Sequence, residues 1–187
     1  MRDIGSSTRQ ILFRNQVLLL FFVIFPLFLL LFITSHLNQT ALFDFDRQLI
    51  WQIHQFANPR YDQLAMNLSY LGGMPTAMIV VLLLVGHSAY IKSKNIFFII
   101  ISVVGSTSLS WLLKVIVDRP RPMLWPRLVP DYGASFPSGH SVYAAAFAGI
   151  FIILYWQTKW RFAVSCFAFA WLLLMGLSRV YLGVHYP

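Results

Sequence analysis

Charged side chains are scarce in this sequence of 187 residues, in which Asp, Glu, Lys and Arg together make up 11%. In soluble domains, charged residues make up roughly a quarter of the sequence. Hydrophobic residues make up 58% of the chain, and its mean hydropathy is +0.69. These values exclude an ordinary soluble domain, and we therefore predict an integral membrane protein.

Cysteine and acidic residues are scarce too. The single cysteine, Cys166, lies inside an apolar run, which excludes a disulfide framework and a cysteine-based metal site. No carboxylate cluster accompanies the five histidines, so we expect no metal ion. The formal net charge is +8, but the basic residues are scattered between apolar segments and form no continuous patch. The sequence therefore predicts no nucleic-acid partner.

The apolar runs predict an all-α fold, a polytopic transmembrane helical bundle that forms a single membrane-embedded domain over residues 1–187. A helix needs about 20 apolar residues to cross a bilayer. Five runs approach that length, and they cover residues 17–34, 74–91, 95–113, 138–156 and 162–178. A further short helix is expected before the Gly72-Gly73 break.

Two polar segments flank the first predicted span. Residues 1–14 are expected to form a cytoplasmic tail, and the apolar run that follows is longer than that of a signal peptide, which favours a retained anchor. Residues 35–62 carry apolar and aromatic side chains at helical spacing, with Asp44 and Asp46 near the start. We interpret this segment as an outward interfacial helix, with an ordered extramembrane loop as an alternative of equal weight.

Basic residues are distributed unevenly between the two sides of this topology. On one side they are opposed only by Asp3, and the positive-inside rule makes that side cytoplasmic. The basic residues of this side are Arg2, Arg9, Arg14, Lys92, Lys94, Lys159 and Arg161. The other side holds five aspartates, which balance most of its basic residues. We expect the protein to span the inner or plasma membrane with its N-terminus in the cytoplasm.

A short stretch with the sequence FPSGH, residues 136–140, opens the fourth predicted span on the outward side. A small-residue turn at a helix start leaves unpaired backbone N–H groups at the positive end of the helix dipole, and this suits a phosphate. His140 in the first turn could give a proton to the group that leaves the phosphate. On its own, the stretch is also compatible with ordinary turn and cap chemistry.

Three segments that are far apart in the sequence reach the same outward face in this topology. They are residues 114–122, 138–140 and 178–185. Lys114, Arg121 and Arg179 supply positive charge, and the two guanidinium groups match the geometry of a tetrahedral anion. Backbone amides near Ser138 and Gly139 add neutral donors. This collection of groups predicts a phosphate site.

His140 and His185 supply two imidazoles on the same face. Phosphoryl transfer through a covalent histidine intermediate requires one neutral nitrogen to attack phosphorus and one proton donor for the leaving oxygen. Cations held around the equatorial oxygens would stabilise the transition state. The pattern therefore favours an enzyme that cleaves a phosphate ester or a diphosphate.

The remaining basic residues and histidines have simpler interpretations. We expect Arg119 and Arg127 to snorkel toward the membrane interface. His36, His54 and His87 are interpreted as polar or interfacial residues. A transporter would need charged or broken helices in the middle of the membrane, whereas the charges here lie near the ends of the predicted spans.

The spacing of these residues resembles the three-part signature of the type-2 phosphatidic acid phosphatase superfamily. Its parts are Lys114, six residues and Arg121-Pro122, then Pro137-Ser138-Gly139-His140, then Ser178-Arg179, five residues and His185. The resemblance implies that His185 is the nucleophile and His140 the general acid. It also implies a set of phosphate-binding residues, namely Lys114, Arg121, Ser138, Gly139 and Arg179.

The same resemblance implies six spans, no metal cofactor, and lipid phosphates or diphosphates as substrates. In the family an aspartate stands four residues after the nucleophilic histidine and orients its ring, whereas this sequence stops at Pro187. The sixth span is missing as well. We therefore expect the chain to be a fragment of a longer protein, because an unoriented imidazole loses much of the positioning that a triad provides.

The sequence thus predicts a metal-independent lipid phosphatase, with a phosphohistidine intermediate, on the outward face of the membrane. By resemblance to bacterial members, undecaprenyl diphosphate, hydrolysed to the monophosphate, is the first candidate substrate. Phosphatidylglycerophosphate and phosphatidic acid are the next candidates. A non-catalytic membrane protein that binds lipid phosphates is the alternative from another class. The expected partners are the bilayer and the lipid substrate, and the sequence leaves the oligomeric state open.

Overall fold

The computed structural model describes residues 28–29, 32, 34–35 and 40–187. Within residues 40–187 the regular elements are helices: α3 (Thr40–His54), α4 (Pro59–Leu71), α5 (Met74–Tyr90), α6 (Asn95–Val117), α7 (Gly139–Tyr155) and α8 (Arg161–Tyr181). The predicted tail, residues 1–14, and most of the first predicted span lie outside the described residues. The predicted all-α fold is confirmed.

The helices after the Gly72-Gly73 break coincide with predicted spans to within a few residues. α6 and α8 are long and apolar enough to cross a membrane, with 23 and 21 residues. α4 and α5 pass the same test together as one span bent by 45°. α7 is apolar but has 17 residues, or about 25 Å at the rise of an α-helix. The chain is a multi-pass helical membrane protein.

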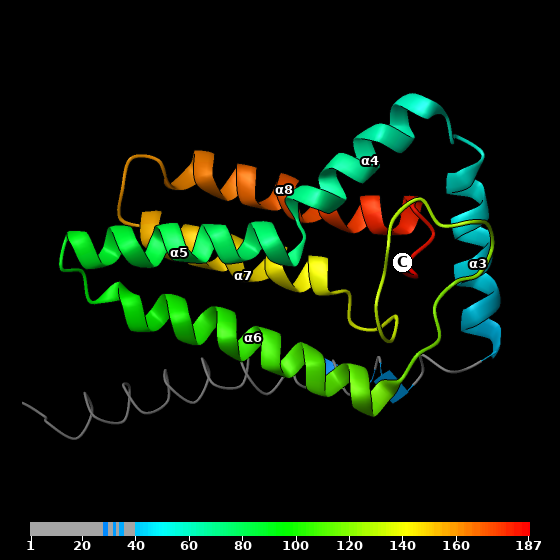
Figure 1. Cartoon of the computed structure of the whole chain (residues 1–187), viewed down its shortest axis with the longest axis horizontal. Coiled ribbons are helices and arrows are strands. Elements are labelled where there is room, and N and C mark those ends of the chain that lie inside the picture. The colour runs from blue at the N-terminus through cyan, green and yellow to red at the C-terminus, as the bar shows by residue number, and fades with distance from the viewer. Residues whose placement is uncertain (1–27, 30–31, 33, 36–39) are drawn as a thin grey trace, which may run out of the picture. The chain divides into compact units, whose positions relative to one another are not determined.

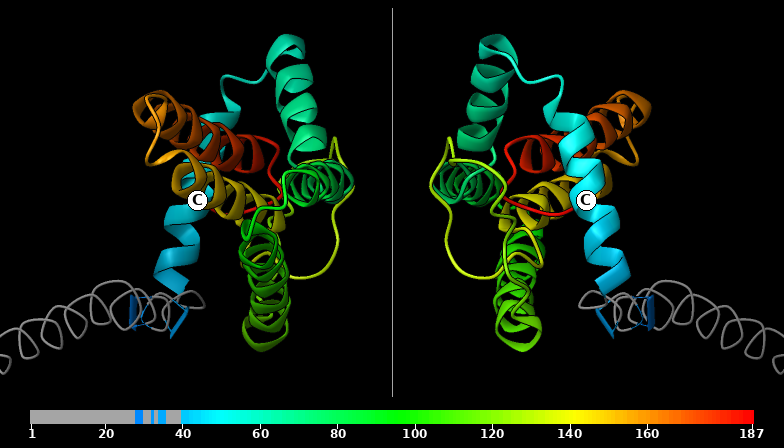
Figure 2. Two further views of the ribbon diagram at one scale, coloured as in Figure 1. Left: turned by 90° about the vertical axis from the view of Figure 1, so that its left-hand side faces the viewer. Right: turned by 90° about the vertical axis from the view of Figure 1, so that its right-hand side faces the viewer.

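α7 packs against both α6 and α8, and α5 contacts both α6 and α7 (Figure 1). The view along the bundle shows these helices grouped around α7 (Figure 2). Buried alanines lie on two of these helices, Ala144 and Ala148 on α7 and Ala168 on α8. Small side chains at such positions let helix backbones approach closely inside a membrane.

The two ends of the bundle differ in composition. The turns that join α5 to α6 and α7 to α8 lie together at one end (Figure 1), and they carry Lys92, Lys94 and Lys159, three of the basic residues predicted to be cytoplasmic. The opposite end holds the last turn of α6, the first turn of α7 and the last turn of α8. The three segments predicted to form a phosphate site therefore meet at one end of the bundle.

The break between α4 and α5 lies at this same end (Figure 1). A Cβ atom at Gly72 would come within 2.2 Å of Cε of Met175 on α8, so any larger residue there would force the end of this side chain to move. At the start of α4, Asn58 accepts hydrogen bonds from the backbone N–H groups of Arg60 and Tyr61. This is a helix cap, and it fixes where α4 begins.

α3 occupies most of the segment that was predicted to be an interfacial helix, and it is helical as expected. Asp46 on α3 forms a buried ion pair with Arg119, at 2.5 Å between Oδ2 and Nη2. The ring of His54 stacks on Trp125, with their centroids 3.7 Å apart. α3 is therefore fixed to the loop between α6 and α7 by one charged and one aromatic contact.

One of two expectations about basic residues was wrong. Arg119 was expected to snorkel toward the interface, but its side chain is buried, because it pairs with Asp46 and lies over the ring of Tyr186. Arg127, which was expected to do the same, is partly exposed, and its Nη1 atom lies 2.7 Å from Oδ1 of Asp131, so its snorkelling stays a prediction. Both arginines pair with carboxylates within the protein, and such partners compete with water for a guanidinium.

Candidate active site

His185 follows α8 and lies against the loop between α6 and α7. Its Nδ1 atom is 2.5 Å from the carbonyl oxygen of Ser135, and its Nε2 atom is 3.0 Å from Nη1 of Arg121. A carbonyl can only accept a hydrogen bond, so Nδ1 carries the proton of the neutral ring. Nε2 then keeps its lone pair, which faces the guanidinium of Arg121. This is the tautomer that can attack phosphorus through Nε2.

The surroundings of His185 favour this neutral form. Burial, followed by the positive charges of Arg121 and Arg179, lowers the pKa of the imidazole far below its usual value. The hydrogen bond to Ser135 acts in the opposite direction but is the weaker influence. The ring is therefore unprotonated at neutral pH, as a nucleophile must be.

Arg121 links two chain segments, the loop at residues 131–133 and the segment after α8. Nη2 donates to the carbonyl of Tyr132, Nε to that of Gly133, and Nη1 to that of Val184. Nε also lies 2.9 Å from a carboxylate oxygen of Asp131. The predicted phosphate ligand thus lies beside Nε2 of His185, but its donors are directed at protein oxygens in this structure.

Four consecutive carbonyl groups of the loop accept hydrogen bonds from the site. Those of Tyr132 and Gly133 accept from Arg121, that of Ala134 from Nζ of Lys114 at 2.6 Å, and that of Ser135 from His185. A phosphate has oxygen acceptors of the same kind. A bound phosphate could therefore take over some of these donors without leaving a cation unpaired.

His140 and Arg179 meet at a residue outside the sequence signature. Nε2 of His140 lies 3.1 Å from the carbonyl oxygen of Ser69, and Nη1 of Arg179 donates to the hydroxyl of the same serine. The guanidinium of Arg179 is buried, and its Nε atom has no hydrogen-bond partner among the described residues. The charges of Arg179, Arg121 and Lys114 act on both His140 and His185.

Ser138 and Gly139 form the start of α7. The hydroxyl of Ser138 accepts a hydrogen bond from the N–H group of Ser141 and so caps the helix. A Cβ atom at Gly139 would meet nothing within 4 Å, so the backbone there borders open space. The predicted amide donors are thus available at the helix terminus, although their binding to phosphate stays a prediction.

The structure brings all seven predicted site residues to one end of the bundle and adds three that the sequence analysis missed. The added residues are Ser69, Asp131 and Ser135, which contact Arg179, Arg121 and His185 respectively. Asp131 could have been predicted from the sequence, since it is an acidic residue in an arginine-rich loop. Ser69 lies just before the predicted helix break. Ser135 acts through its main chain, and a backbone carbonyl has no sequence signature.

The ring of His185 is oriented by a main-chain group that the sequence did not reveal. The carbonyl of Ser135 accepts the hydrogen bond of Nδ1–H. The family aspartate, which was expected to orient the ring, would lie beyond Pro187, and its role stays a prediction. A main-chain acceptor fixes the ring and its tautomer as a carboxylate would, but it adds no negative charge.

Comparison with known proteins agrees with this fold. The chain is 28% identical over 170 residues to phosphatidylglycerophosphatase B of Bacillus subtilis, a match that covers 87% of this chain and 82% of that protein. The fold and this relative indicate that the chain is a membrane-embedded phosphatase. Residues 93–187, more than half of the chain, match the family model described as the PAP2 superfamily. The chain belongs to that superfamily, as the motifs suggested.

Two solved structures share the architecture. The PAP2-type phosphatidylglycerolphosphate phosphatase from Bacillus subtilis superposes with a TM-score of 0.77 at 26% identity, covering 86% of this chain and 83% of that one. LpxE from Aquifex aeolicus gives a TM-score of 0.61 at 26% identity, covering 75% and 82%. Both similarities extend well beyond the residues of the signature.

The lowered pKa of His185 gives a prediction for its titration. A lowered pKa means that the ring stays neutral as the pH falls through the usual histidine value of about 6.5. We expect NMR of histidine-labelled protein in detergent to show the Nδ1–H tautomer of His185 unchanged from about pH 7 to about pH 5. The His185→Gln variant assigns the signal. Protonation of this ring within that range would contradict the geometry described above.

Proposed function

We propose that this protein removes a phosphate group from a membrane lipid through a phosphohistidine formed on Nε2 of His185. The observation that carries the proposal is the position of this atom. It is unprotonated, it lies 3.0 Å from Nη1 of Arg121, and its ring is fixed on the other side by Ser135. A phosphoryl group bound by Arg121 would be held next to the attacking nitrogen.

The first chemical step forms a bond between phosphorus and Nε2 of His185 and breaks the bond between phosphorus and the lipid oxygen. His140 gives a proton to that leaving oxygen, so the lipid departs as an alcohol or, from a diphosphate, as a monophosphate. Lys114, Arg121 and Arg179 stabilise the charge on the equatorial oxygens, the task that metal ions perform in many phosphoryl transfer enzymes.

The second step releases inorganic phosphate. A water molecule attacks phosphorus, His140 now accepts a proton from it, and the bond to Nε2 of His185 breaks. The nitrogen recovers its lone pair, while Nδ1 keeps its proton on the carbonyl of Ser135 throughout. His140 thus acts as an acid in the first step and as a base in the second, and His185 is first the nucleophile and then the leaving group.

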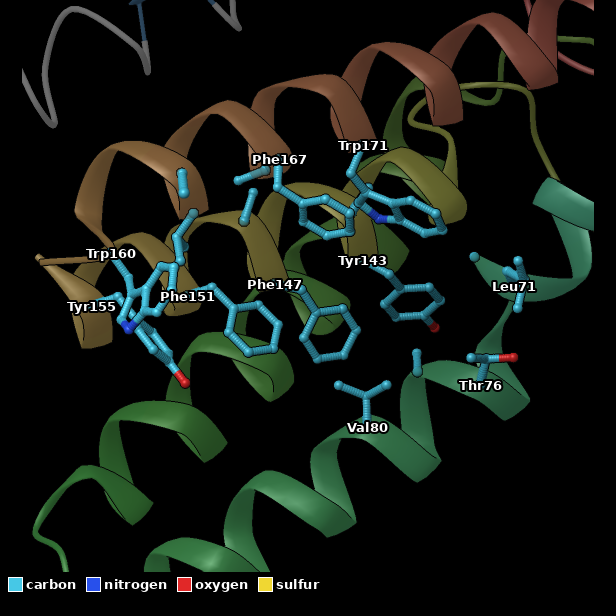
Figure 3. Close-up of a pocket in the computed structure, with 17 residues that line it drawn as sticks. Leu71, Thr76, Val80, Tyr143, Phe147, Phe151, Tyr155, Trp160, Phe167 and Trp171 are labelled. Carbon is cyan, nitrogen blue, oxygen red and sulfur yellow. The ribbon is translucent and has the colours of Figure 1, made fainter. Parts of the chain in front are cut away.

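A long apolar groove supports a lipid substrate. It has a volume of about 790 Å³ and lies between α5, α7 and α8 (Figure 3). Tyr143, Phe147 and Phe151 form a row along it at four-residue spacing, because every fourth residue of a helix lies on the same face. We call it the tail groove and assign it to a hydrocarbon chain of the substrate.

The tail groove begins close to His140. Gly72 and Thr76 line it near the α4–α5 break, and a Cβ atom at the adjacent Gly73 would lie 3.7 Å from Nε2 of His140. Tyr155 lines the far part of the groove, and the α7 rise from Tyr143 to Tyr155 is about 18 Å. One leaflet of a bilayer is about 15 Å deep in hydrocarbon, so the groove matches one lipid tail.

The head group is proposed from the relatives. The phosphatidylglycerophosphatases of Bacillus subtilis are similar over most of this chain in sequence and in structure. We therefore place phosphatidylglycerophosphate first among the substrates, ahead of phosphatidic acid. Undecaprenyl diphosphate, the first candidate from the sequence, stays a prediction. The exposed side chain of Phe167 on the groove lining favours keeping it, because a longer tail can pass out toward the lipid there.

Sidedness is part of the proposal. The site lies at the end of the bundle opposite the loops that carry Lys92, Lys94 and Lys159. The positive-inside rule puts those loops in the cytoplasm and the site on the outward face of the inner or plasma membrane. The N-terminal tail is proposed to lie on the cytoplasmic side as well.

The mechanism predicts that each histidine is required. We expect His185→Ala to reduce phosphate release from phosphatidylglycerophosphate to the background rate, and His140→Ala to reduce it by at least about a hundredfold, because a general acid contributes at least that much. A chelator such as EDTA is expected to have no effect. Wild-type turnover in the His185 variant would exclude the mechanism, and an inactive wild type that still binds lipid phosphate would favour the non-catalytic alternative.

The tail groove predicts a dependence on chain length. Ala163 lines the groove on α8, whereas the equally exposed Ala170 does not. We expect Ala163→Phe to raise KM for a dioleoyl substrate by roughly tenfold, as losing burial of about two methylenes would. The dioctanoyl substrate should be unaffected, and so should Ala170→Phe with either substrate. Equal effects of the two variants would show that the tail binds elsewhere.

A further inference from the structure

Ser69 lies in the last turn of α4, outside the residues that match the family model. It is buried, and the bend between α4 and α5 follows within a few residues. A buried serine in a membrane helix often bonds only to its own backbone. Here both polar groups of Ser69 are directed at residues of the proposed site, which makes its position unusual.

The carbonyl of Ser69 is available because the helix ends there. In a continuous helix it would accept the N–H group of Gly73, four residues on. The chain turns instead, and Gly73 donates to the carbonyl of Tyr70 at 3.3 Å. The freed carbonyl of Ser69 accepts from Nε2–H of His140 at 3.1 Å. The break thus turns an unused helix-end acceptor into the partner of the general acid.

The hydroxyl of Ser69 accepts from Nη1 of Arg179. Among the described residues, the guanidinium makes this one hydrogen bond, and no carboxylate pairs with it. The side chain of Arg179 is 2% exposed, so water cannot replace a lost partner. The orientation of this buried cation therefore depends on the hydroxyl of Ser69.

Glycine at the break allows this geometry. A Cβ atom at Gly73 would lie 3.3 Å from the carbonyl oxygen of Ser69 and 3.7 Å from Nε2 of His140, so it would crowd the space between these two partners. Gly72 lets the end of α4 approach Met175, one turn before Arg179 on α8. The two glycines bring Ser69 close to both α7 and α8.

We propose that Ser69 is a positioning residue of the active site, which holds the general acid His140 through its carbonyl and the phosphate-binding Arg179 through its hydroxyl. This proposal rests on the function proposed above. Ser69 touches no reacting atom. It sets the relative position of an acid from α7 and a cation from α8, and so couples the α4–α5 break to catalysis.

A purely structural role would give a different pattern of effects. If Ser69 only satisfied a buried donor, its loss would lower stability and would change kcat only through unfolding. A positioning role predicts a loss of kcat in folded protein, weaker binding of a transition-state mimic, and recovery when the hydroxyl is restored. Orthovanadate is a suitable mimic, since it adopts the five-coordinate geometry of phosphorus in the transition state.

The test compares Ser69→Ala and Ser69→Thr with Ser88→Ala in protein solubilised in lipid–detergent micelles. Ser88 is an equally buried serine on α5. We expect Ser69→Ala to lower kcat for phosphatidylglycerophosphate about tenfold and to raise the inhibition constant of orthovanadate by a similar factor, the effect of one lost hydrogen bond to a charged group. KM should change little, and the variant should remain folded at the assay temperature even if its Tm is lowered. Ser69→Thr should recover most of both losses, and Ser88→Ala should match the wild type.

Several results would overturn the proposal. Wild-type kcat and vanadate affinity in Ser69→Ala would do so, as would losses of the same size in Ser88→Ala. A loss in Ser69→Ala that appears only together with a lowered Tm, and that threonine does not recover, would show a structural role. If the wild type binds orthovanadate but hydrolyses no lipid phosphate, the proposed function fails, and the vanadate affinity of Ser69→Ala still decides the role of Ser69.

Discussion

The structure depends on holding several positive charges close together in a partly buried space with little negative charge to balance them. Among the described residues, Asp131 is the acidic side chain that forms ion pairs within this group, with Arg121 and Arg127. Lys114 and Arg121 otherwise rely on loop carbonyls, and Arg179 relies on a serine hydroxyl. Neutral acceptors orient the cations without cancelling their charge. The site is therefore suited to an anion with several oxygens.

The same arrangement accounts for the state of the histidines. Burial, together with the charges of Arg121 and Arg179, disfavours a protonated imidazole and lowers the pKa of His185, so its ring remains neutral. The carbonyl of Ser135 fixes which nitrogen carries the proton. The α4–α5 break supplies a second carbonyl, that of Ser69, to His140. Both imidazoles are thus oriented by main-chain acceptors, which come from places where the chain leaves regular secondary structure.

Much of this could be predicted from the sequence, for physical reasons. Spans are readable because a membrane requires long apolar helices, and helix ends on one face must lie near one another. For this reason the topology alone predicts that Lys114, His140 and Arg179 share one face. The contacts of Ser69 and Ser135 could not be predicted, because they depend on how a bend and a loop fold in space. The burial of Arg119 was missed for the same reason, since Asp46 lies far away in the sequence.

The central claim is that Nε2 of His185 becomes bonded to phosphorus during turnover. The most direct measurement is a rapid acid-free quench of the enzyme with a phosphate-labelled lipid, followed by peptide mass spectrometry. A phosphoramidate is stable to alkali and labile to acid. We predict such a label on the peptide that contains His185, formed as fast as the lipid product is released. Lipid phosphate hydrolysis without any label on His185, or with the label on another residue, would contradict this account.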